Sequence, residues 1–236
     1  MKLKELLLYL VVAFGRRMPR LLRFLPLRAD MITRLNSKEA YDLLYAQDDM
    51  LDQYLSPGRL SFYEEVANHC SEVLVTTYPV STVRVVDLGC GTGHLLFYLW
   101  KCLGRSPHVE FWGVDHAPAA IERGKELMPQ AKLIIGDIYN TNLYSNYFDL
   151  VLCTETLEHL QFPERAVKEM DRICRPCGKT VITVPDGAKD KWAGHVNFWT
   201  ESDLWEFLKP FGVREILPLD NEMVFGAVLS KDREVI

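Results

Sequence analysis

The sequence lacks an apolar run that could cross a bilayer, and it lacks the cysteine pattern of a disulfide scaffold. The unbroken apolar stretch at residues 6–14 has nine residues, whereas a membrane-spanning helix needs about 20. Six cysteines in 236 residues show no disulfide-like rhythm, which favours reduced thiols and a cytoplasmic rather than a secreted protein. With 48% hydrophobic and 25% charged residues, the composition is that of a globular protein and excludes disordered and collagen-like classes.

Positive charge is scarce outside the first 30 residues. Residues 1–30 carry seven basic and two acidic residues, a net charge of +5, which leaves −10 for the rest of a chain whose total is −5. The acidic body argues against a nucleic-acid partner. Arginines follow the apolar stretch and no small-residue cleavage site is evident, so we do not expect a signal peptide.

Two interpretations of residues 1–30 remain open. One is an amphipathic helix in an anionic membrane interface, which would make the protein a peripheral membrane protein. The other is a helix that packs on its own domain or on a second subunit; the sequence does not indicate an oligomeric state. We divide the chain into a basic tail at 1–30, a helical cap at 31–80 and a main domain at 81–236.

Helical patterns precede residue 81, and short apolar segments alternate with amphipathic ones after it. In the cap, Ser37 and Ser61 each stand before an apolar-periodic stretch, and the turn at residues 56–58 separates two predicted helices. In the main domain we expect helices at 94–103, 118–128, 158–174 and 202–209, and strands at 83–88, 110–115, 132–135, 148–153, 180–184, 213–217 and 223–229. Apolar strands linked by helices predict a parallel sheet covered on both faces, and the last two strands predict a closing hairpin.

The first predicted strand ends in a glycine-rich loop, Asp-Leu-Gly-Cys-Gly-Thr-Gly at residues 87–93. Ligands of parallel sheets bind at the carboxyl ends of strands, and glycines allow the backbone to turn tightly and approach a ligand. A dinucleotide-binding loop would place its third glycine where His94 stands, which disfavours a nicotinamide oxidoreductase. Asp87, two residues before the first glycine, favours a cationic ligand such as an ammonium or sulfonium group.

The loop resembles motif I of class I S-adenosylmethionine (SAM)-dependent methyltransferases, in particular the methyltransferase-11 and ubiquinone-pathway O-methyltransferase group. Four further segments are similar to that family in the same order: Gly-Val-Asp ending at 115, Ile-Gly-Asp-Ile at 135–138, Tyr-Phe-Asp at 147–149 and Arg-Pro-Cys-Gly at 175–178. The resemblance covers about residues 60–230.

The resemblance implies an α/β fold and a cofactor. The fold is a Rossmann-like three-layer α/β/α sandwich with a seven-stranded, mostly parallel sheet, an antiparallel last strand and an N-terminal helical cap. The cofactor is SAM, with Asp115 on the ribose hydroxyls and Asp137 near the adenine amino group. The implied cofactor-binding residues are Asp87, Gly89, Cys90, Gly91, Gly93, Asp115, His116, Asp137 and Ile138.

Histidines and carboxylates follow the fourth and fifth predicted strands. The sulfonium methyl group is already activated, so a methyltransferase mainly aligns its substrates, but a hydroxyl acceptor must lose a proton and histidine is a natural base. The resemblance implies that His159 and His195 border the acceptor pocket, and we expect His159, His195 and Glu155 to be catalytic. The expected function is O-methylation of a small or lipid- or sugar-linked acceptor.

Two alternatives stay open. Glu155, Glu158, His159 and His195 could hold a divalent metal such as Mg²⁺, Mn²⁺ or Zn²⁺, and the Glu-x-x-Glu-His spacing is similar to that of metal-dependent small-RNA 3′-terminal 2′-O-methyltransferases. Otherwise, Glu158 is an ordinary acid at a helix N-terminus. The second alternative is a non-catalytic SAM-fold module that binds a membrane through residues 1–30.

Overall fold

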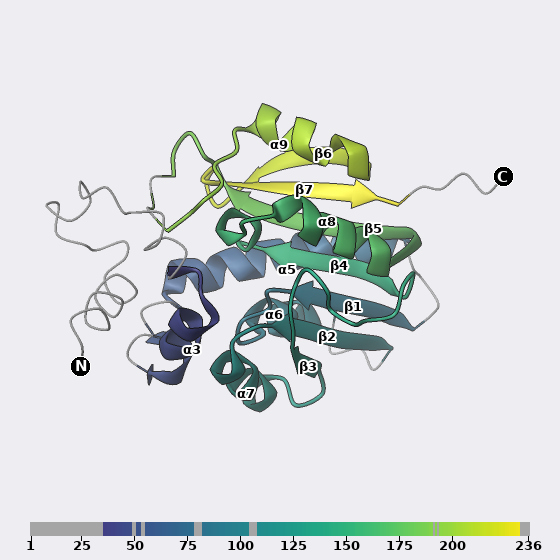
Figure 1. Cartoon of the computed structure of the whole chain (residues 1–236). Helices are drawn as coiled ribbons and strands as arrows, with labels where there is room; N and C mark the ends of the chain where they lie inside the picture. Colours follow the sequence, from purple (N-terminus) through teal and green to yellow (C-terminus); the bar gives the residue numbers. More distant parts are fainter. Residues whose placement is uncertain are drawn as a thin grey trace, which may run out of the picture.

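The computed structural model describes residues 35–48, 51–52, 55–77, 82–103, 108–190, 192 and 194–231 (Figure 1). The predicted interfacial helix in the basic tail lies outside these residues. Within the described ranges, no helix combines the length and the apolar character that crossing a membrane requires.

In the described part of the chain, seven strands form one sheet in the order β3-β2-β1-β4-β5-β7-β6. The strands are β1 (Val83–Leu88), β2 (Val109–Asp115), β3 (Lys132–Ile135), β4 (Phe148–Thr154), β5 (Cys174–Pro185), β6 (Val213–Leu219) and β7 (Val224–Ser230). Strand β7 runs antiparallel to both β5 and β6, and the pairs among β1–β5 are parallel. The predicted seven-stranded, mostly parallel sheet with an antiparallel last strand is therefore confirmed.

Helices cover both faces of the sheet and complete the predicted three layers (Figure 1). They are α3 (Lys38–Ala46), α5 (Pro57–Thr77), α6 (His94–Cys102), α7 (Pro118–Leu127), α8 (Pro163–Ile173) and α9 (Glu201–Leu208), with 3-10 turns η2 (Leu157–His159) and η3 (Lys209–Phe211). Helices α5, α6 and α7 contribute to one apolar core, and α8 and α9 contribute to the other.

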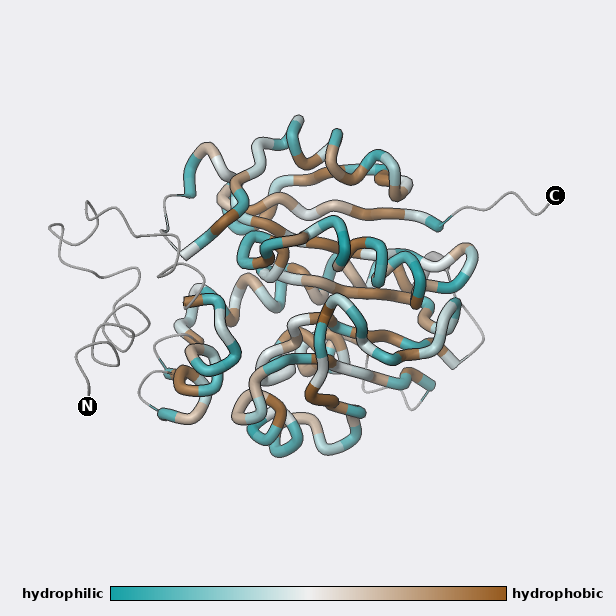
Figure 2. The backbone as a smooth tube through the Cα atoms, viewed as in Figure 1, coloured by the Kyte–Doolittle hydropathy of each residue, from teal (hydrophilic) through white to brown (hydrophobic). Residues whose placement is uncertain are grey.

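Alternate residues of each central strand serve the two cores. In β1, Val85 packs into the core under α5 and α6, while Val86 packs into the core under α8. Successive side chains of a strand point to opposite faces, so a strand buried on both faces must be apolar at nearly every position. Figure 2 shows the result as brown central strands with hydrophilic helix surfaces around them.

Two predicted helix boundaries are wrong. Pro57 begins α5 instead of lying in a turn before it, because proline's fixed φ suits the first helical position, and Ser61 lies inside that helix instead of capping it. The helix predicted over 158–174 is interrupted: η2 ends at His159, and α8 starts only at Pro163. This break leaves His159 on a short turn at the end of β4.

Helix α3 lies over the carboxyl edge of the sheet. Ser37 caps it by accepting a hydrogen bond from the Ala40 amide (3.3 Å). Its Asp42 accepts a bond from the amide of Ala119, in the first turn of α7 (2.7 Å), and Arg123 of α7 binds Asp48 just after α3 (2.6 Å). These contacts hold the middle and the end of α3 on α7, while Asn36, just before α3, donates to the Gly194 carbonyl oxygen (2.9 Å).

Candidate active site

The glycine-rich loop after β1 has a backbone that only glycine adopts easily. Gly89 and Gly91 have φ values of 81° and 51°. A Cβ atom at Gly89 would collide with the side chain of Thr156, and one at Gly91 would lie 2.8 Å from the hydroxyl of Tyr45. The loop thus packs closely against Thr156, after β4, and against Tyr45 of α3. A side chain at Gly89 or Gly91 would not fit there.

Asp87 is a buried acid, and one of its carboxylate oxygens lacks a hydrogen-bond partner among the described residues. It is 2% exposed, and the oxygen concerned is Oδ1. Burial, and then the charge of Asp115, raise the pKa of Asp87 to about 7. A cationic group bound nearby would stabilise the ionised carboxylate, so this site fits the ammonium group of SAM.

Asp115 ends β2 with both carboxylate oxygens oriented by backbone amides. Its Oδ2 accepts from the Gly91 amide (2.8 Å) and its Oδ1 from the Ala117 amide (2.9 Å). A carboxylate has about four acceptor positions, so Asp115 can also accept bonds from two ribose hydroxyls. The Cys90 side chain, in contrast, packs against Gly113, so this residue would contribute its backbone to a ligand and not its thiol.

A cavity of about 660 Å³ opens at the carboxyl edge of the sheet. Among the predicted cofactor residues, His116, Asp137 and Ile138 line it, and the predicted catalytic residue His159 lines it too. The Asp137 carboxylate accepts a bond from the Tyr139 amide (2.9 Å), which fixes its position on the wall. The glycine loop does not line this cavity, because α3 covers it.

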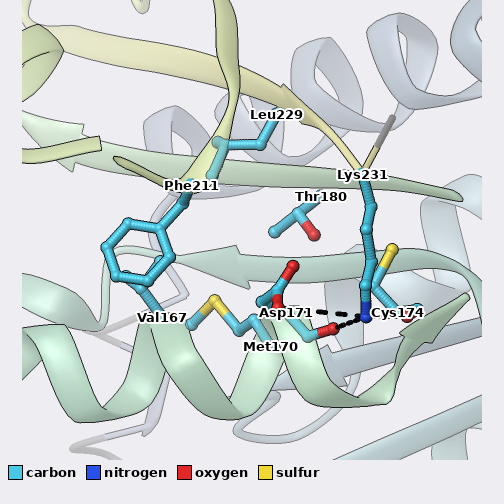
Figure 3. A pocket seen from close by; sticks show the side chains of 8 residues that line it. All are labelled: Val167, Met170, Asp171, Cys174, Thr180, Phe211, Leu229 and Lys231. Carbon is cyan, nitrogen blue, oxygen red and sulfur yellow. Dashed lines mark hydrogen bonds and ion pairs between the residues drawn. The ribbon is translucent and has the colours of Figure 1, made fainter. Parts of the chain in front are cut away.

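A second cavity lies at the opposite edge of the sheet, between α8 and the amino end of β5 (Figure 3). Its volume of about 10 Å³ holds about one water molecule. Lys231 donates to the carbonyl oxygens of Asp171 and Cys174 at the end of α8 and so caps that helix. This cavity is too small for a substrate, so the larger one is the candidate active site.

Three acceptor side chains meet beside the larger cavity, and we call Glu158, His159 and His195 the histidine corner. The Nε2 atoms of His159 and His195 lie 3.6 and 3.9 Å from Oε1 of Glu158. Glu158 is 1% exposed, and burial and the charge of Glu155 raise its pKa well above the ordinary value. Burial, and then the neighbouring His195, lower the pKa of His159 well below its usual range, so its imidazole is neutral at neutral pH.

Glu155 does not join the histidine corner. Its Oε2 atom lies 3.8 Å from Nη1 of Arg59, and its Oε1 atom accepts from the Thr183 hydroxyl (3.5 Å). The four-residue cluster proposed from the sequence is thus a three-residue cluster with a charged neighbour. Glu155 acts on the corner through its charge, which opposes ionisation of Glu158.

A family model described as a methyltransferase domain matches residues 86–182, which contain the glycine loop, Asp115, Asp137 and the strand before the histidine corner. This chain contains a class I SAM-dependent methyltransferase domain. Its cofactor is SAM, as the fit of the glycine loop and Asp87 indicates.

The methyltransferase domain has relatives among characterised proteins. Demethylmenaquinone methyltransferase of Thermotoga maritima is 23% identical over 150 residues, which cover 64% of this chain and 62% of that protein. The chloroplastic 2-methyl-6-phytyl-1,4-hydroquinone methyltransferase of Arabidopsis thaliana is 24% identical over 175 residues, 72% of this chain and 47% of that protein. The chain therefore corresponds to about half the length of these relatives.

Solved structures show the same fold. The plantazolicin methyltransferase BpumL, solved with a desmethylplantazolicin analogue and S-adenosylhomocysteine (SAH), superimposes with a TM-score of 0.65 at 17% identity. The match covers 87% of this chain and 100% of that chain. A SAM-dependent methyltransferase from Aquifex aeolicus gives a TM-score of 0.61 at 17% identity, over 76% of this chain and 96% of that chain.

Three residues outside the matched segment hold the histidine corner together and were not predicted from the sequence. The Asn197 side chain donates to the carbonyl oxygens of Leu157 (3.0 Å) and Leu160 (2.7 Å), and so ties the loop after β5 to η2. Asn36 Oδ1 lies 3.0 Å from Nδ1 of His159, and Asp190 Oδ2 lies 2.5 Å from Nδ1 of His195. These residues lie in loops with no periodic pattern, so the sequence carries no signal for them.

Proposed function

We propose that this protein transfers the methyl group of SAM to a hydroxyl oxygen of a small acceptor, or of a small terminal group on a lipid- or sugar-linked molecule. The observation that carries the proposal is the pair of imidazoles in the histidine corner, His159 and His195. Each has its Nδ1 atom beside an oxygen of another side chain, so each directs an Nε2 lone pair towards the corner. Such lone pairs suit an acceptor whose proton must leave.

The reaction needs little from the protein beyond alignment and proton removal. SAM supplies a methyl carbon on a sulfonium; the acceptor oxygen forms a bond to this carbon, the sulfur–carbon bond breaks with its electron pair going to sulfur, and the hydroxyl proton leaves. Asp87 and Asp115 would hold the amino and ribose groups, and His116, Asp137 and Ile138 would line the adenine side of the site. The Tyr45 side chain of α3 lies close to Gly91 of the glycine loop.

The histidine corner can remove the hydroxyl proton in two ways. One neutral imidazole can accept the proton directly, as the lowered pKa of His159 permits. Alternatively, both imidazoles and the carboxylate can hold a cation that lowers the pKa of a bound hydroxyl. The first way uses one residue of the corner, and the second uses all three.

The cavity supports an acceptor with an apolar body and a polar end. Ile135 and Val196 line it and are 48% and 40% exposed, so they offer apolar contact, while His159 and Asn197 supply polar contact on the same wall. Two relatives are named for methylating a quinone and a hydroquinone, molecules that combine these features. We propose acceptors of this shape first.

Calorimetric titration of the purified chain with SAM and SAH, followed by turnover with SAM carrying a deuterated methyl group, tests the proposal. Phenols, hydroquinones and sugar alcohols serve as acceptors, and NMR of the product identifies the methylated atom. We expect a deuterated methyl ether. Methylation on carbon or nitrogen would contradict the hydroxyl assignment, and SAM binding without turnover on any acceptor would favour a non-catalytic SAM-binding module.

We also propose that residues 1–30 bind an anionic membrane surface. The support is the net charge of +5 beside a nine-residue apolar stretch. A chain without residues 1–28 should no longer sediment with anionic liposomes and should still bind SAM. If the shortened chain sediments as well as the full chain, the membrane assignment is wrong.

A further inference from the structure

The histidine corner brings the carboxyl group of Glu158 and the Nε2 atoms of two histidines together without a hydrogen bond between them. Neither carboxylate oxygen of Glu158 has a hydrogen-bond partner among the described residues, although the side chain is only 1% exposed. A buried acceptor left without a partner costs about 1–3 kcal/mol, and more when it is charged. In native structures such a group has an explanation such as a bound water or ion, stored strain or a catalytic role.

The two imidazoles are oriented so that their donor nitrogens face away from Glu158. His159 has its Nδ1 atom 3.0 Å from Asn36 Oδ1, and His195 has its Nδ1 atom 2.5 Å from Asp190 Oδ2. An Nδ1–H that donates to an oxygen places the lone pair of the ring on Nε2. Both Nε2 lone pairs then point towards Oε1 of Glu158, at 3.6 and 3.9 Å.

This arrangement is typical of metal-binding histidines. A metal-ligating imidazole donates its other N–H to a carboxylate, a carbonyl or water, which fixes the tautomer. Ligand atoms at tetrahedral angles on a metal with bonds of about 2.1 Å are about 3.4 Å apart. The three ligand atoms of the corner lie within 4.8 Å of one another, so modest side-chain movement brings them onto one ion.

We propose that the histidine corner binds one divalent first-row transition-metal ion through a carboxylate oxygen of Glu158 and the Nε2 atoms of His159 and His195. Two imidazoles with one carboxylate suit Zn²⁺, Mn²⁺, Fe²⁺ or Co²⁺, whereas Mg²⁺ and Ca²⁺ prefer all-oxygen sites. Asn36 and Asp190 are positioning residues, because they hold the rings and do not touch the ion.

The role of this ion in catalysis rests on the proposed function. His159 also lines the large cavity, so an acceptor oxygen in that cavity lies within reach of a further coordination position. Coordination lowers the pKa of a bound hydroxyl, whose proton then passes to solvent, and the imidazoles act as ligands instead of as bases. The binding of the ion itself does not depend on this role.

Metal binding by the full chain tests the proposal directly. The chain is stripped with EDTA, dialysed, and titrated with Zn²⁺ against a chromophoric chelator and with Co²⁺ by visible absorption. We expect about one ion per chain, with Co²⁺ bands that indicate nitrogen ligands. Glu158→Gln, His159→Gln and His195→Gln should each weaken binding by at least about 100-fold, and Asn36→Ala and Asp190→Asn by about 10–100-fold.

His116→Gln is the matched control, because His116 lines the same cavity but lies outside the corner. It should bind Zn²⁺ as tightly as the unchanged chain. Substoichiometric binding by the unchanged chain, or equal binding by the His159 and His195 variants, would overturn the proposal. The groups of the corner would then share a proton instead of a metal ion. SAM titration of the same samples separates this outcome from a failure of the proposed function, since SAM binding does not need the corner.

Discussion

The glycine loop and the histidine corner lie at the same edge of the same sheet, yet Asp115 beside the loop and Glu158 in the corner are bonded in opposite ways. Asp115 beside the loop accepts bonds from two backbone amides, whereas Glu158 in the corner accepts none from the described residues. The loop is one contiguous segment, while the corner combines η2 with the loop after β5 and depends on Asn36 for orientation. Backbone amides therefore orient Asp115 before a ligand arrives, although Asp87 keeps one unpartnered oxygen, whereas neither carboxylate oxygen of Glu158 has a hydrogen-bond partner among the described residues.

This difference separates two kinds of binding. A site whose polar groups are already satisfied by backbone amides recognises a ligand through the acceptor positions that remain. A site with converging, unsatisfied acceptors attracts a cation and is costly without one. Substitutions at the glycine loop should therefore lower SAM affinity, and substitutions at the histidine corner should lower turnover. Removing a satisfied carboxylate should lower the free energy of unfolding, and removing an unsatisfied one should raise it.

His159→Ala should have the largest effect. It removes an imidazole that serves either as a base or as a metal ligand, so we expect turnover to fall by about 10²–10⁴-fold while SAM affinity stays unchanged. Steady-state kinetics and calorimetric titration measure the two quantities. His108→Ala, at an exposed position before β2, is the control and should leave both unchanged. Equal losses of turnover and of SAM affinity in His159→Ala would show that the two regions act as a single site.

Asp115→Ala should affect the other region. It removes the acceptor that orients the amides of Gly91 and Ala117 and that would bind the ribose hydroxyls. Hydrogen bonds to a charged group contribute about 1.5–3 kcal/mol each, so we expect SAM affinity to fall on the order of 100-fold. Glu110→Ala, on the same strand but in a surface ion pair with Lys132, is the control. Metal binding at the corner should not change, and unchanged SAM affinity would show that Asp115 does not hold the cofactor.

The two regions also differ in how well the sequence predicts them. Strands β1 and β3 match their predicted bounds. Strand β1 is apolar at nearly every position because it is buried on both faces, whereas β3 is a half-exposed edge strand that a glycine follows. Strand β5 is longer than predicted: it begins at Cys174, which pairs with Phe148 of β4, and its pairing with both β4 and β7 continues from Lys179. The local amino-acid composition does not predict this pairing with neighbouring strands.

The glycine loop was predictable because its residues are adjacent and each has a local conformational reason. The histidine corner was predictable only in part: His159 and His195 stand out by type, but the side chains that orient them do not. Asn36 reaches the corner because α3 docks on α7, and Asp190 because the loop after β5 folds back. Glu155 was wrongly grouped with the cluster, because sequence spacing does not reveal its contact with Arg59.

Asn197→Ala should break the link between the two halves of the corner, with a smaller effect. The Asn197 amide donates to the carbonyls of Leu157 and Leu160, and both bonds would be lost. We expect a loss of about 1–3 kcal/mol in the free energy of unfolding, measured by urea denaturation, together with lower turnover. The exposed Asn140→Ala variant is the control. If Asn197→Ala keeps full stability and full turnover, the clamp does not hold the corner.

Glu158→Gln should have the smallest effect, and its sign is the most informative. In the metal-free chain the substitution removes a buried carboxyl group that has no hydrogen-bond partner among the described residues and supplies an amide donor for the two Nε2 lone pairs. We therefore expect the free energy of unfolding to rise by about 1 kcal/mol, although metal binding is lost. Urea denaturation in EDTA measures this change. A residue that lowers the stability of the metal-free fold while organising a site is kept for that site.

Glu169→Gln is the matched comparison for the sign of the stability change, because Glu169 is also buried but its carboxylate accepts several hydrogen bonds. Its carboxylate accepts from the Thr141 amide and hydroxyl (2.8 and 2.6 Å) and from Arg172 (2.7 Å). The same substitution there removes satisfied, charge-assisted bonds, so it should lower the free energy of unfolding by about 1–3 kcal/mol. If both variants destabilise the chain equally, Glu158 has a partner in the folded protein, and the contrast between the histidine corner and the glycine loop no longer holds. Opposite signs would place the unsatisfied acceptors at the corner and favour a bound cation as their natural partner.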